Sequence, residues 1–168
     1  GFAGRTFHAP LLLSAPGLVL AAVVSRHPQA VHDALGPEVA VHADAANLLA
    51  RDDIDLVVIA TPNDSHHPLA RAALEAGKAV VVDKPFTLDA REAEDLIALA
   101  AQRGLLLSVF HNRRWDGDFL TLQALLASGR LGRLVHVESH FDRFRPQVRA
   151  RWREAGLQEI RGDLVVDK

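Results

Sequence analysis

Lys84 is the residue whose position in the sequence points most directly to chemistry. It follows Asp83 and the apolar run Ala79–Val82, which has the pattern of a buried strand. Because an unpaired ammonium is costly to bury, a lysine at the end of such a strand calls for an explanation. It could take the proton of a substrate hydroxyl while a hydride moves to a nicotinamide, or return that proton in the reverse reaction. The alternative is an ion pair with Asp83 that merely ends the strand.

A glycine-rich segment opens the chain and suggests the cofactor for that chemistry. Gly1-Phe2-Ala3-Gly4 fits the last four residues of a G-x-G-x-x-G turn. One glycine of that turn lets the backbone approach a pyrophosphate, and the N-terminus of the next helix offers N–H groups to the phosphates. We expect Gly1, Phe2, Ala3 and Gly4 to bind a dinucleotide, and a strand with the first glycine to precede residue 1. A chance pair of glycines is the alternative.

The choice between the two nicotinamide dinucleotides depends on the residues after the next strand. In dinucleotide-binding folds an acidic residue about 20 positions on usually binds the ribose 2′-hydroxyl. This chain carries Ser25 and Arg26 there, directly after Leu18–Val24. Both side chains can donate to a 2′-phosphate, which a carboxylate would repel. The sequence therefore favours NADP over NAD, with a solvated surface arginine as the alternative.

Polar loops follow two more apolar runs, Leu56–Ala60 and Leu106–Phe110. Ligands of open parallel sheets bind at the carboxyl ends of the strands, where such loops lie. Arginine and tryptophan side chains can also pack on a planar ring. Helix capping in the first loop and packing at a domain hinge in the second are the alternatives. From these two loops we expect the following residues in the cofactor site: Thr61, Pro62, Asn63, His66, Arg113 and Trp115. Asp83 and Lys84 are expected to contact the cofactor too.

Two groupings of histidine could suggest a metal, but neither predicts one. His66 and His67 are adjacent on a predicted helix, so their side chains point apart. Metal ligands must converge on one point. The second group consists of His136, Glu138, His140 and Asp142, which are spread along one face of a predicted strand. Such a face suits an exposed polar surface or a contact with another subunit.

These candidate residues require a fold that brings the carboxyl ends of several strands together. Apolar runs alternate with helical patterns up to Phe110, which is typical of repeated βαβ units and a parallel sheet. Several runs are apolar throughout, as strands covered on both faces are. We expect strands over Leu18–Val24, Val39–His42, Leu56–Ala60, Ala79–Val82 and Leu106–Phe110. We expect helices near Pro28–Leu35, Ala45–Arg51, Pro68–Ala76 and Leu88–Arg103.

Local signals mark the ends of several helices. Thr87 is expected to cap the N-terminus of the last of these helices. Gly77 and Gly104 stand where helices should stop. Because Pro10 has no backbone donor, we expect a break or kink near Phe7–Pro10 in the first helix.

The pattern changes after Phe110. Phe119–Ser128 has the period of a helix. Val135–Phe144 alternates between apolar and polar residues, as a strand of an antiparallel sheet with one packed face does. We therefore expect a dinucleotide-binding domain over residues 1–115, without its first strand, and the beginning of a second domain over residues 116–168.

The composition excludes several classes of function. A net charge of −2 gives no reason to expect binding to nucleic acid or to an anionic membrane. Without cysteine the chain has neither disulfides nor thiolate chemistry. Its apolar runs are too short to span a bilayer, and no signal peptide is visible. We expect a cytoplasmic protein that acts on a small molecule.

The candidate motifs together resemble the glucose–fructose oxidoreductase and inositol dehydrogenase family, often written Gfo/Idh/MocA. The resemblance covers Gly1 to about Glu154 and rests on Gly1-Phe2-Ala3-Gly4, Ala60-Thr61-Pro62-Asn63, Asp83-Lys84-Pro85 and Asn112-Arg113-Arg114-Trp115. Three further runs resemble the branch that contains NADP-dependent scyllo-inositol dehydrogenases, namely Phe7-His8-Ala9-Pro10, Val109-Phe110-His111-Asn112 and Ser139-His140-Phe141-Asp142-Arg143-Phe144.

The resemblance implies a fold and an activity. The expected fold class is α/β, with a Rossmann-like parallel sheet covered by helices on both faces and then an α/β domain with an open antiparallel sheet. The expected reaction is oxidation or reduction at a hydroxyl carbon of a sugar or a cyclitol such as an inositol, with NADP or, less favoured, NAD. Lys84 matches the family's active-site lysine, and Asp83 replaces the glutamate of most members. We expect a homo-oligomer at full length.

The chain also departs from the family's pattern. Beyond Glu154 the family has a Gly-rich loop and a helix with an active-site Asp and His, and Ala155–Lys168 contains no such pattern. Since the first strand is absent too, we expect these 168 residues alone to be marginally stable and catalytically silent, with an open sheet edge beside Leu18–Val24. The rival hypothesis is a nucleotide-binding fragment or regulatory relic without turnover.

Overall fold

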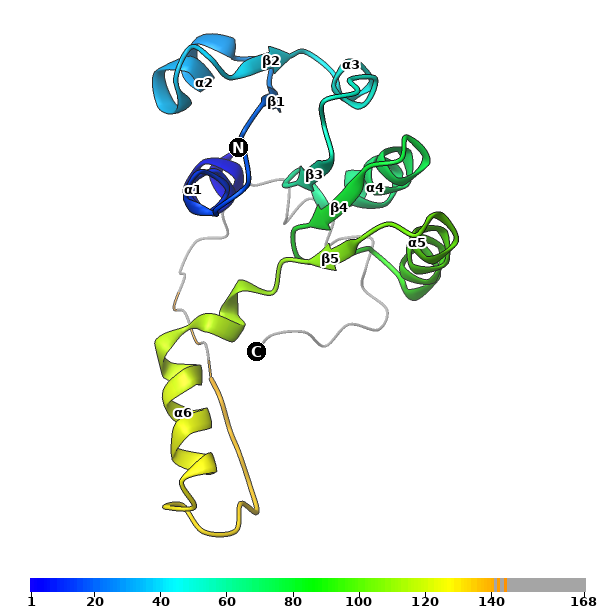
Figure 1. The fold of residues 1–168 in the computed structure, drawn as a ribbon. Coiled ribbons are helices and arrows are strands. Elements are labelled where there is room, and N and C mark those ends of the chain that lie inside the picture. Colours follow the sequence, from blue (N-terminus) through cyan, green and yellow to red (C-terminus); the bar gives the residue numbers. More distant parts are fainter. Residues whose placement is uncertain (141, 143, 145–168) are drawn as a thin grey trace. The chain divides into compact units, whose positions relative to one another are not determined.

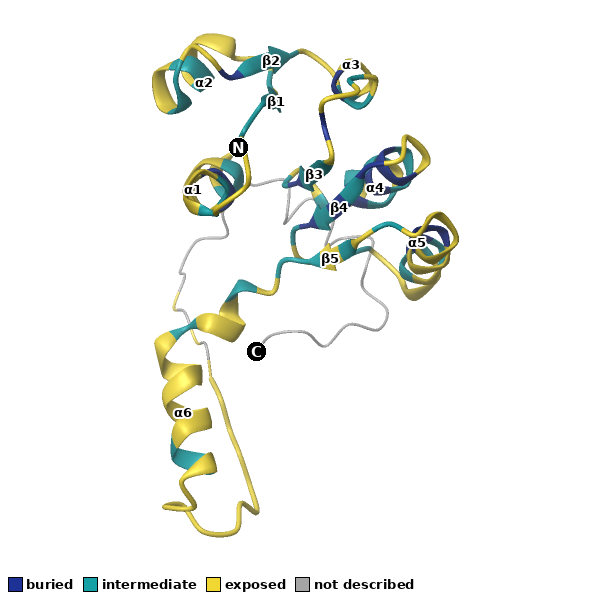
Figure 2. Ribbon diagram, in the orientation of Figure 1, coloured by how far each residue is buried: buried dark blue, intermediate teal, exposed yellow. Residues whose placement is uncertain are grey.

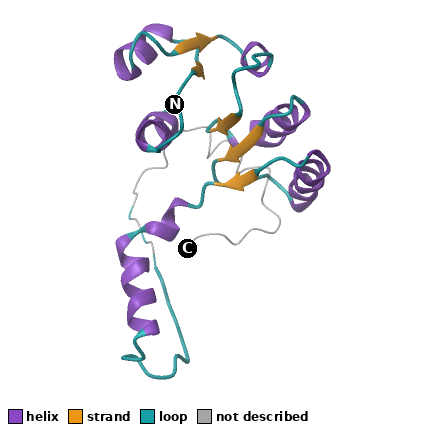
Figure 3. Ribbon diagram, viewed as in Figure 1, coloured by secondary structure: helices purple, strands orange, loops and turns teal. Residues whose placement is uncertain are grey.

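The computed structural model of this protein describes residues 1–140, 142 and 144. The chain divides into two compact units, Gly1–His111 and Asn112–Lys168. The predicted boundary after residue 115 lies a few residues beyond this division. Figure 1 gives the order of the elements along the chain, and Figure 3 gives their type.

Five strands form in the first unit, and all of their pairings are parallel, as predicted. They make two sheets, of order β1–β2 and β3–β4–β5. Only the strand over Ala79–Val82 has the predicted bounds, and the other four strands are shorter than the apolar runs that predicted them. The strands are β1 (Ala22–Val24), β2 (Ala40–His42), β3 (Leu56–Ile59), β4 (Ala79–Val82) and β5 (Leu107–Val109).

The break between the two sheets follows the order of strands in a Rossmann fold. Among the described residues β1 pairs with β2 alone, and β3 pairs with β4 alone. In the order 3-2-1-4-5-6 the first strand lies between the second and the fourth. The second and fourth strands of that order correspond to β1 and β3 of this chain, and both β1 and β3 have an open edge. The predicted open edge beside the Leu18–Val24 segment is therefore confirmed.

The helices also form where the sequence predicts them, one of them with the predicted bounds Pro28–Leu35 and the others with shifted ends. The irregularity expected near Phe7–Pro10 takes the form of a π-helical turn, η1 (Gly4–His8), that leads into α1 (Ala9–Ser14). Gly104 ends α5 in the left-handed conformation, with a φ of 64°, and Gly77 follows α4 with a φ of 76°. The remaining helices of the first unit are α2 (Pro28–Leu35), α3 (Ala45–Leu49), the 3₁₀ turn η2 (Asn63–Ser65), α4 (His66–Glu75) and α5 (Ala90–Arg103).

The prediction that Thr87 caps α5 is wrong, since Asp89 holds that position. The backbone of Asp89 is extended, and its Oδ1 accepts a hydrogen bond of 2.9 Å from the Glu92 N–H. The Thr87 hydroxyl instead donates to the carbonyl oxygen of Asp89. A carboxylate at this position also interacts favourably with the positive end of the helix dipole.

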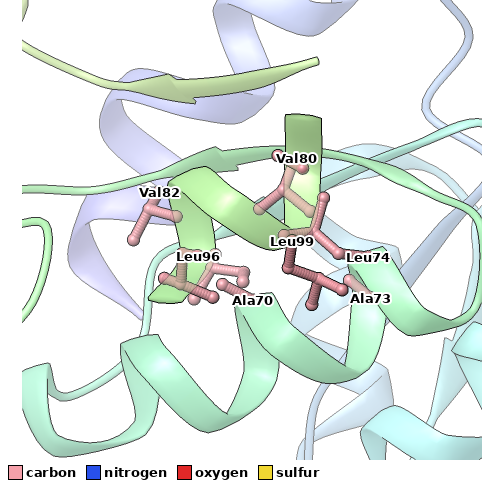
Figure 4. Close-up of a cluster of buried hydrophobic side chains, with 9 residues drawn as sticks. Ala70, Ala73, Leu74, Val80, Val82, Leu96 and Leu99 are labelled. Carbon is pink, nitrogen blue, oxygen red and sulfur yellow. The ribbon is translucent and has the colours of Figure 1, made fainter. Parts of the chain in front are cut away.

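The core lies between the β3–β4–β5 sheet and the pair of helices α4 and α5. Val80 and Val82 are both 0% exposed, because alternate residues of β4 face the helices. Leu74 of α4 and Leu96 of α5 are also 0% exposed and belong to the same cluster (Figures 2 and 4). In Figure 1, α1 lies on the side of these strands away from α4 and α5, so helices flank both faces as predicted.

The second unit contains the 3₁₀ turn η3 (Asn112–Trp115) and α6 (Gly117–Ala127), the latter within two residues of the predicted helix. The strand predicted over Val135–Phe144 is absent from residues 135–140, 142 and 144, while residues 141 and 143 lie outside the described part. A strand needs a hydrogen-bonded neighbour, and the described residues of this unit supply none. No helix in the described part of the chain is long and apolar enough to cross a membrane.

Replacing Asp89 with Ala should lower the free energy of unfolding by about 1 kcal/mol, because the N–H of Glu92 then loses its acceptor. Urea unfolding followed by circular dichroism measures this change. Glu94→Ala, at an exposed position of the same helix, is the matched control and should change stability by less than about 0.5 kcal/mol. Equal effects of the two substitutions would contradict the assignment of the cap.

Candidate functional site

Polar segments follow the carboxyl ends of β3 and β4, and the first helix lies against the same edge of the sheet. Parallel pairing brings these ends together, since Ile59 of β3 is in register with Val82 of β4. Val82 is in turn in register with Val109 of β5. The loop from Thr61 and the turn from Asp83 therefore leave neighbouring strands at one level.

The glycine-rich segment begins the first helix beside the end of β3. The Arg5 N–H donates to the Gly1 carbonyl at 3.1 Å, which places Gly1 in the opening turn. The N–H groups of an opening turn have no acceptor within their own helix. A Cβ built on Gly1 would come within 4.0 Å of the Ala60 carbonyl oxygen, so Gly1 lies near the last residue before the Thr61 loop.

His8 joins this helix to the ends of β4 and β5. Its side chain is buried, its ring centroid lies 4.3 Å from that of Phe110, and its Nε2 lies 3.8 Å from Asp83 Oδ2. This Nε2 has no hydrogen-bond partner among the described residues. Burial lowers the pKa of His8, and the Asp83 carboxylate acts in the opposite direction. Sequence reasoning missed His8 as a site residue, because a lone histidine on a helix does not reveal which face is buried.

Lys84 lies on the turn that leaves β4, with an exposed side chain. Asp83 Oδ1 accepts a hydrogen bond of 2.8 Å from the backbone N–H of Lys84, and the Lys84–Pro85 peptide bond is cis. No hydrogen bond or ion pair joins the Lys84 ammonium to another described residue. The alternative interpretation, an ion pair between Lys84 and Asp83, is therefore not observed in the structure.

The Thr61 loop is tied together by its own side chains and by His66. The Ser65 hydroxyl lies 2.6 Å from the Pro62 carbonyl oxygen and 2.7 Å from Thr61 Oγ1. His66 begins α4 and is 1% exposed. Its Nε2 lies 3.0 Å from the Thr61 carbonyl oxygen, and its Nδ1 lies 2.7 Å from the Pro85 carbonyl oxygen. The two loops are thus joined through one imidazole, while Asn63 is half-buried at the start of η2.

Ser25 and Arg26 follow β1, the strand at the open edge of the other sheet. The Ser25 N–H continues the pairing with a hydrogen bond of 2.9 Å to the His42 carbonyl, and the Ser25 hydroxyl accepts from the His27 N–H at 3.1 Å. Arg26 is exposed, and among the described residues no hydrogen bond or ion pair engages its guanidinium. An exposed guanidinium of this kind can bind an anion.

Arg113 and Trp115 lie in the second unit, in η3. Arg113 forms an ion pair of 2.6 Å with Asp116, and Trp115 is 76% exposed. Their place in a cofactor site stays a prediction. Within residues 1–140, 142 and 144, no group of three or more His, Asp or Glu side chains could hold a metal ion.

Comparison with known proteins identifies relatives of both units. The model of the oxidoreductase family with an NAD-binding Rossmann fold, GFO/IDH/MocA, matches residues 1–111. The model of the GFO/IDH/MocA C-terminal domain matches residues 119–166. The first match covers well over half of the chain and contains all of the candidate residues of the first unit.

Individual relatives match almost the whole chain. The oxidoreductase YdgJ of Escherichia coli (strain K12) is 58% identical over 93% of this chain and 45% of its own length. The scyllo-inositol 2-dehydrogenase (NADP(+)) IolW of Bacillus subtilis (strain 168) is 37% identical over 92% of this chain and 43% of its own. The structure of YPO2259 from Yersinia pestis superposes with a TM-score of 0.87 and 57% identity, over 93% of this chain and 44% of that one.

The chain thus spans less than half of the length of these relatives. Its parallel strands, their order and the glycine turn agree with the family's Rossmann fold. The protein belongs to the GFO/IDH/MocA family of oxidoreductases.

Proposed function

We propose that this chain is the cofactor-binding part of an NADP-preferring dehydrogenase that acts on a hydroxyl carbon of a polyol or sugar, such as an inositol. One observation carries the proposal. The exposed ammonium of Lys84, without a partner in the described residues, lies on the turn next to the helix that begins with Gly1. A relative named as an NADP-dependent scyllo-inositol dehydrogenase supports the substrate class.

The residues of the first unit suit a dinucleotide. Gly4 does not have a positive φ, and a Cβ at Gly1 or at Gly4 would meet no described atom closer than 4.0 Å. Nothing in the described part of the chain therefore requires glycine there, whereas a phosphate that approaches the backbone would. The unpaired N–H groups of the first helical turn, including those of Phe2 and Ala3, are the donors for that phosphate.

The preference for NADP rests on Arg26. Its exposed guanidinium follows β1, where a dinucleotide fold holds the adenosine ribose, and no carboxylate stands beside it in the segment Val24–His27. A guanidinium can form charge-assisted hydrogen bonds to a 2′-phosphate. Ser25 adds a hydroxyl next to it.

Lys84 would move the proton in this reaction. Oxidation of an alcohol removes a hydride from carbon and a proton from oxygen, and the nicotinamide, when bound, accepts the hydride. The neutral amine of Lys84 takes the hydroxyl proton, and the ammonium returns it in the reverse direction. Asp83 holds the backbone of Lys84 through the hydrogen bond to its N–H.

The remaining site residues complete the proposal. Thr61, Pro62 and Asn63 form the loop after β3, at the level of the Lys84 turn. The place of Arg113 and Trp115 in the site rests on the family resemblance and on the ability of arginine and tryptophan side chains to pack on a planar ring. A cytoplasmic location rests on the composition, and a homo-oligomer at full length rests on the resemblance.

Replacing Arg26 with Ala in the full-length protein should weaken NADP binding by about 1–3 kcal/mol, because a charge-assisted contact to the 2′-phosphate is lost. NAD binding should stay nearly unchanged. Titration of both cofactors by tryptophan or nicotinamide fluorescence measures the two affinities. Arg91→Ala, an exposed arginine of α5, is the control. An unmutated protein that binds NAD as tightly as NADP would refute the assignment.

Replacing Lys84 with Ala or Met should lower turnover of a polyol by about 10²–10⁴-fold, the usual contribution of a general acid or base. The dissociation constant of NADP should change much less, since the ammonium acts on the substrate. Steady-state kinetics at saturating cofactor and a separate binding titration test both statements. Turnover that survives the substitution nearly intact would make Lys84 a structural residue.

A further inference from the structure

The Lys84 side chain has no hydrogen bond or ion pair with the described residues, so its position depends on the turn that carries it. Two buried histidines from different helical elements approach this turn, one near Asp83 and the other at Pro85. Lys84 lies between these two residues. The position of the Lys84 ammonium therefore depends on how His8 holds Asp83 and how His66 holds Pro85.

His66 joins the Asp83–Pro85 turn to the Thr61 loop, which follows the neighbouring strand β3. Its two ring nitrogens lie 2.7 Å from the Pro85 carbonyl oxygen and 3.0 Å from the Thr61 carbonyl oxygen. The ring is 1% exposed, so water does not compete for these contacts. Because both carbonyl oxygens only accept, a neutral imidazole donates to one of them, and both hydrogen bonds form together only on the imidazolium. In either state the buried ring lies between the Thr61 loop and the Lys84 turn and keeps them apart.

His8 approaches the turn from the glycine-rich helix, which is the helical segment that runs from Gly1 through η1 into α1. Asp83 has one oxygen, Oδ1, on the Lys84 N–H, and its other oxygen, Oδ2, faces His8 Nε2 at 3.8 Å. A buried nitrogen without a partner is unfavourable, and Asp83 is the charged group that faces it. A shift of less than about 1 Å would bring the pair to hydrogen-bond distance. Phe110 packs on the ring and limits its other movements.

We propose that His8 and His66 are positioning residues, which fix the Asp83–Pro85 turn, and with it the Lys84 ammonium, against the glycine-rich helix and the Thr61 loop. This inference rests on the proposed function, because the position of the Lys84 ammonium affects turnover only if Lys84 carries the proton. The competing view is that both histidines only stabilise the fold.

Chemical labelling of lysine tests the placement without any enzymatic turnover. Acetic anhydride acetylates Lys84, and peptide mass spectrometry measures its rate against that of Lys78, which is 9% exposed and donates to the Arg51 carbonyl at 2.7 Å. In His66→Ala and in His8→Ala of the full-length protein, the ratio of the Lys84 rate to the Lys78 rate should change by at least about threefold, because the loosened turn no longer fixes the surroundings of the exposed ammonium. Unchanged rates in both variants would overturn the proposal.

His67 supplies a matched control for these variants. It is the next residue of α4, and its Nε2 contacts Asp95 of α5 at 2.8 Å and not the Asp83–Pro85 turn. His67→Gln should leave the Lys84 labelling rate and the turnover unchanged. If His66→Ala does not fold, His66→Gln retains one amide donor and should give an intermediate labelling rate.

A double-mutant cycle separates positioning from general stabilisation. In the unmutated background His66→Ala should lower turnover by about tenfold, and in the Lys84→Ala background it should lower the residual turnover by less than about twofold. Similar losses in both backgrounds would mean that His66 acts on the fold and not through Lys84. Labelling that responds as expected in a protein without NADP-dependent turnover would instead retain the positioning role and refute the proposed function.

Discussion

The register of β3, β4 and β5 is the constraint on which the candidate site depends. Parallel pairing aligns Ile59, Val82 and Val109, so the segments that follow them emerge at one edge. Val80 and Val82 hold this register because their side chains are wholly enclosed by α4 and α5. A slip by one residue would turn both valines to the other face and would move Asp83 and Lys84 away from the edge.

The proposed cofactor would contact both sheets of the first unit. Arg26 follows β1, whereas Lys84 follows β4, and the glycine-rich helix lies near the ends of β3 and β4. NADP carries its 2′-phosphate at the adenosine end, its pyrophosphate in the middle and its reactive nicotinamide ring at the other end, which suits an arginine and a lysine on different strands. The open edges of β1 and β3 fall between these two groups in the order of strands.

Elements with purely local signals were predictable from the sequence, and long-range arrangements were less so. The bounds of β4 and α2 agree with the prediction, since an apolar run and a proline start are local features. The cap at Asp89 was missed because Thr87 and Asp89 are both good caps and only the backbone geometry selects one. The strand expected after Val135 needs a partner strand that the described residues do not contain. The contacts of His8 depend on how a helix packs over two strands, and periodicity alone does not determine this.

A crystal structure of the full-length protein with NADP bound tests the central claim most directly. The account predicts a pyrophosphate on the N–H groups of Gly1–Gly4, a 2′-phosphate on Arg26 and a nicotinamide ring beside the Lys84 ammonium. It also predicts that His66 still joins Thr61 to Pro85 in that complex. A dinucleotide bound away from the carboxyl ends of β3 and β4, or a Lys84 side chain directed away from the nicotinamide, would contradict it.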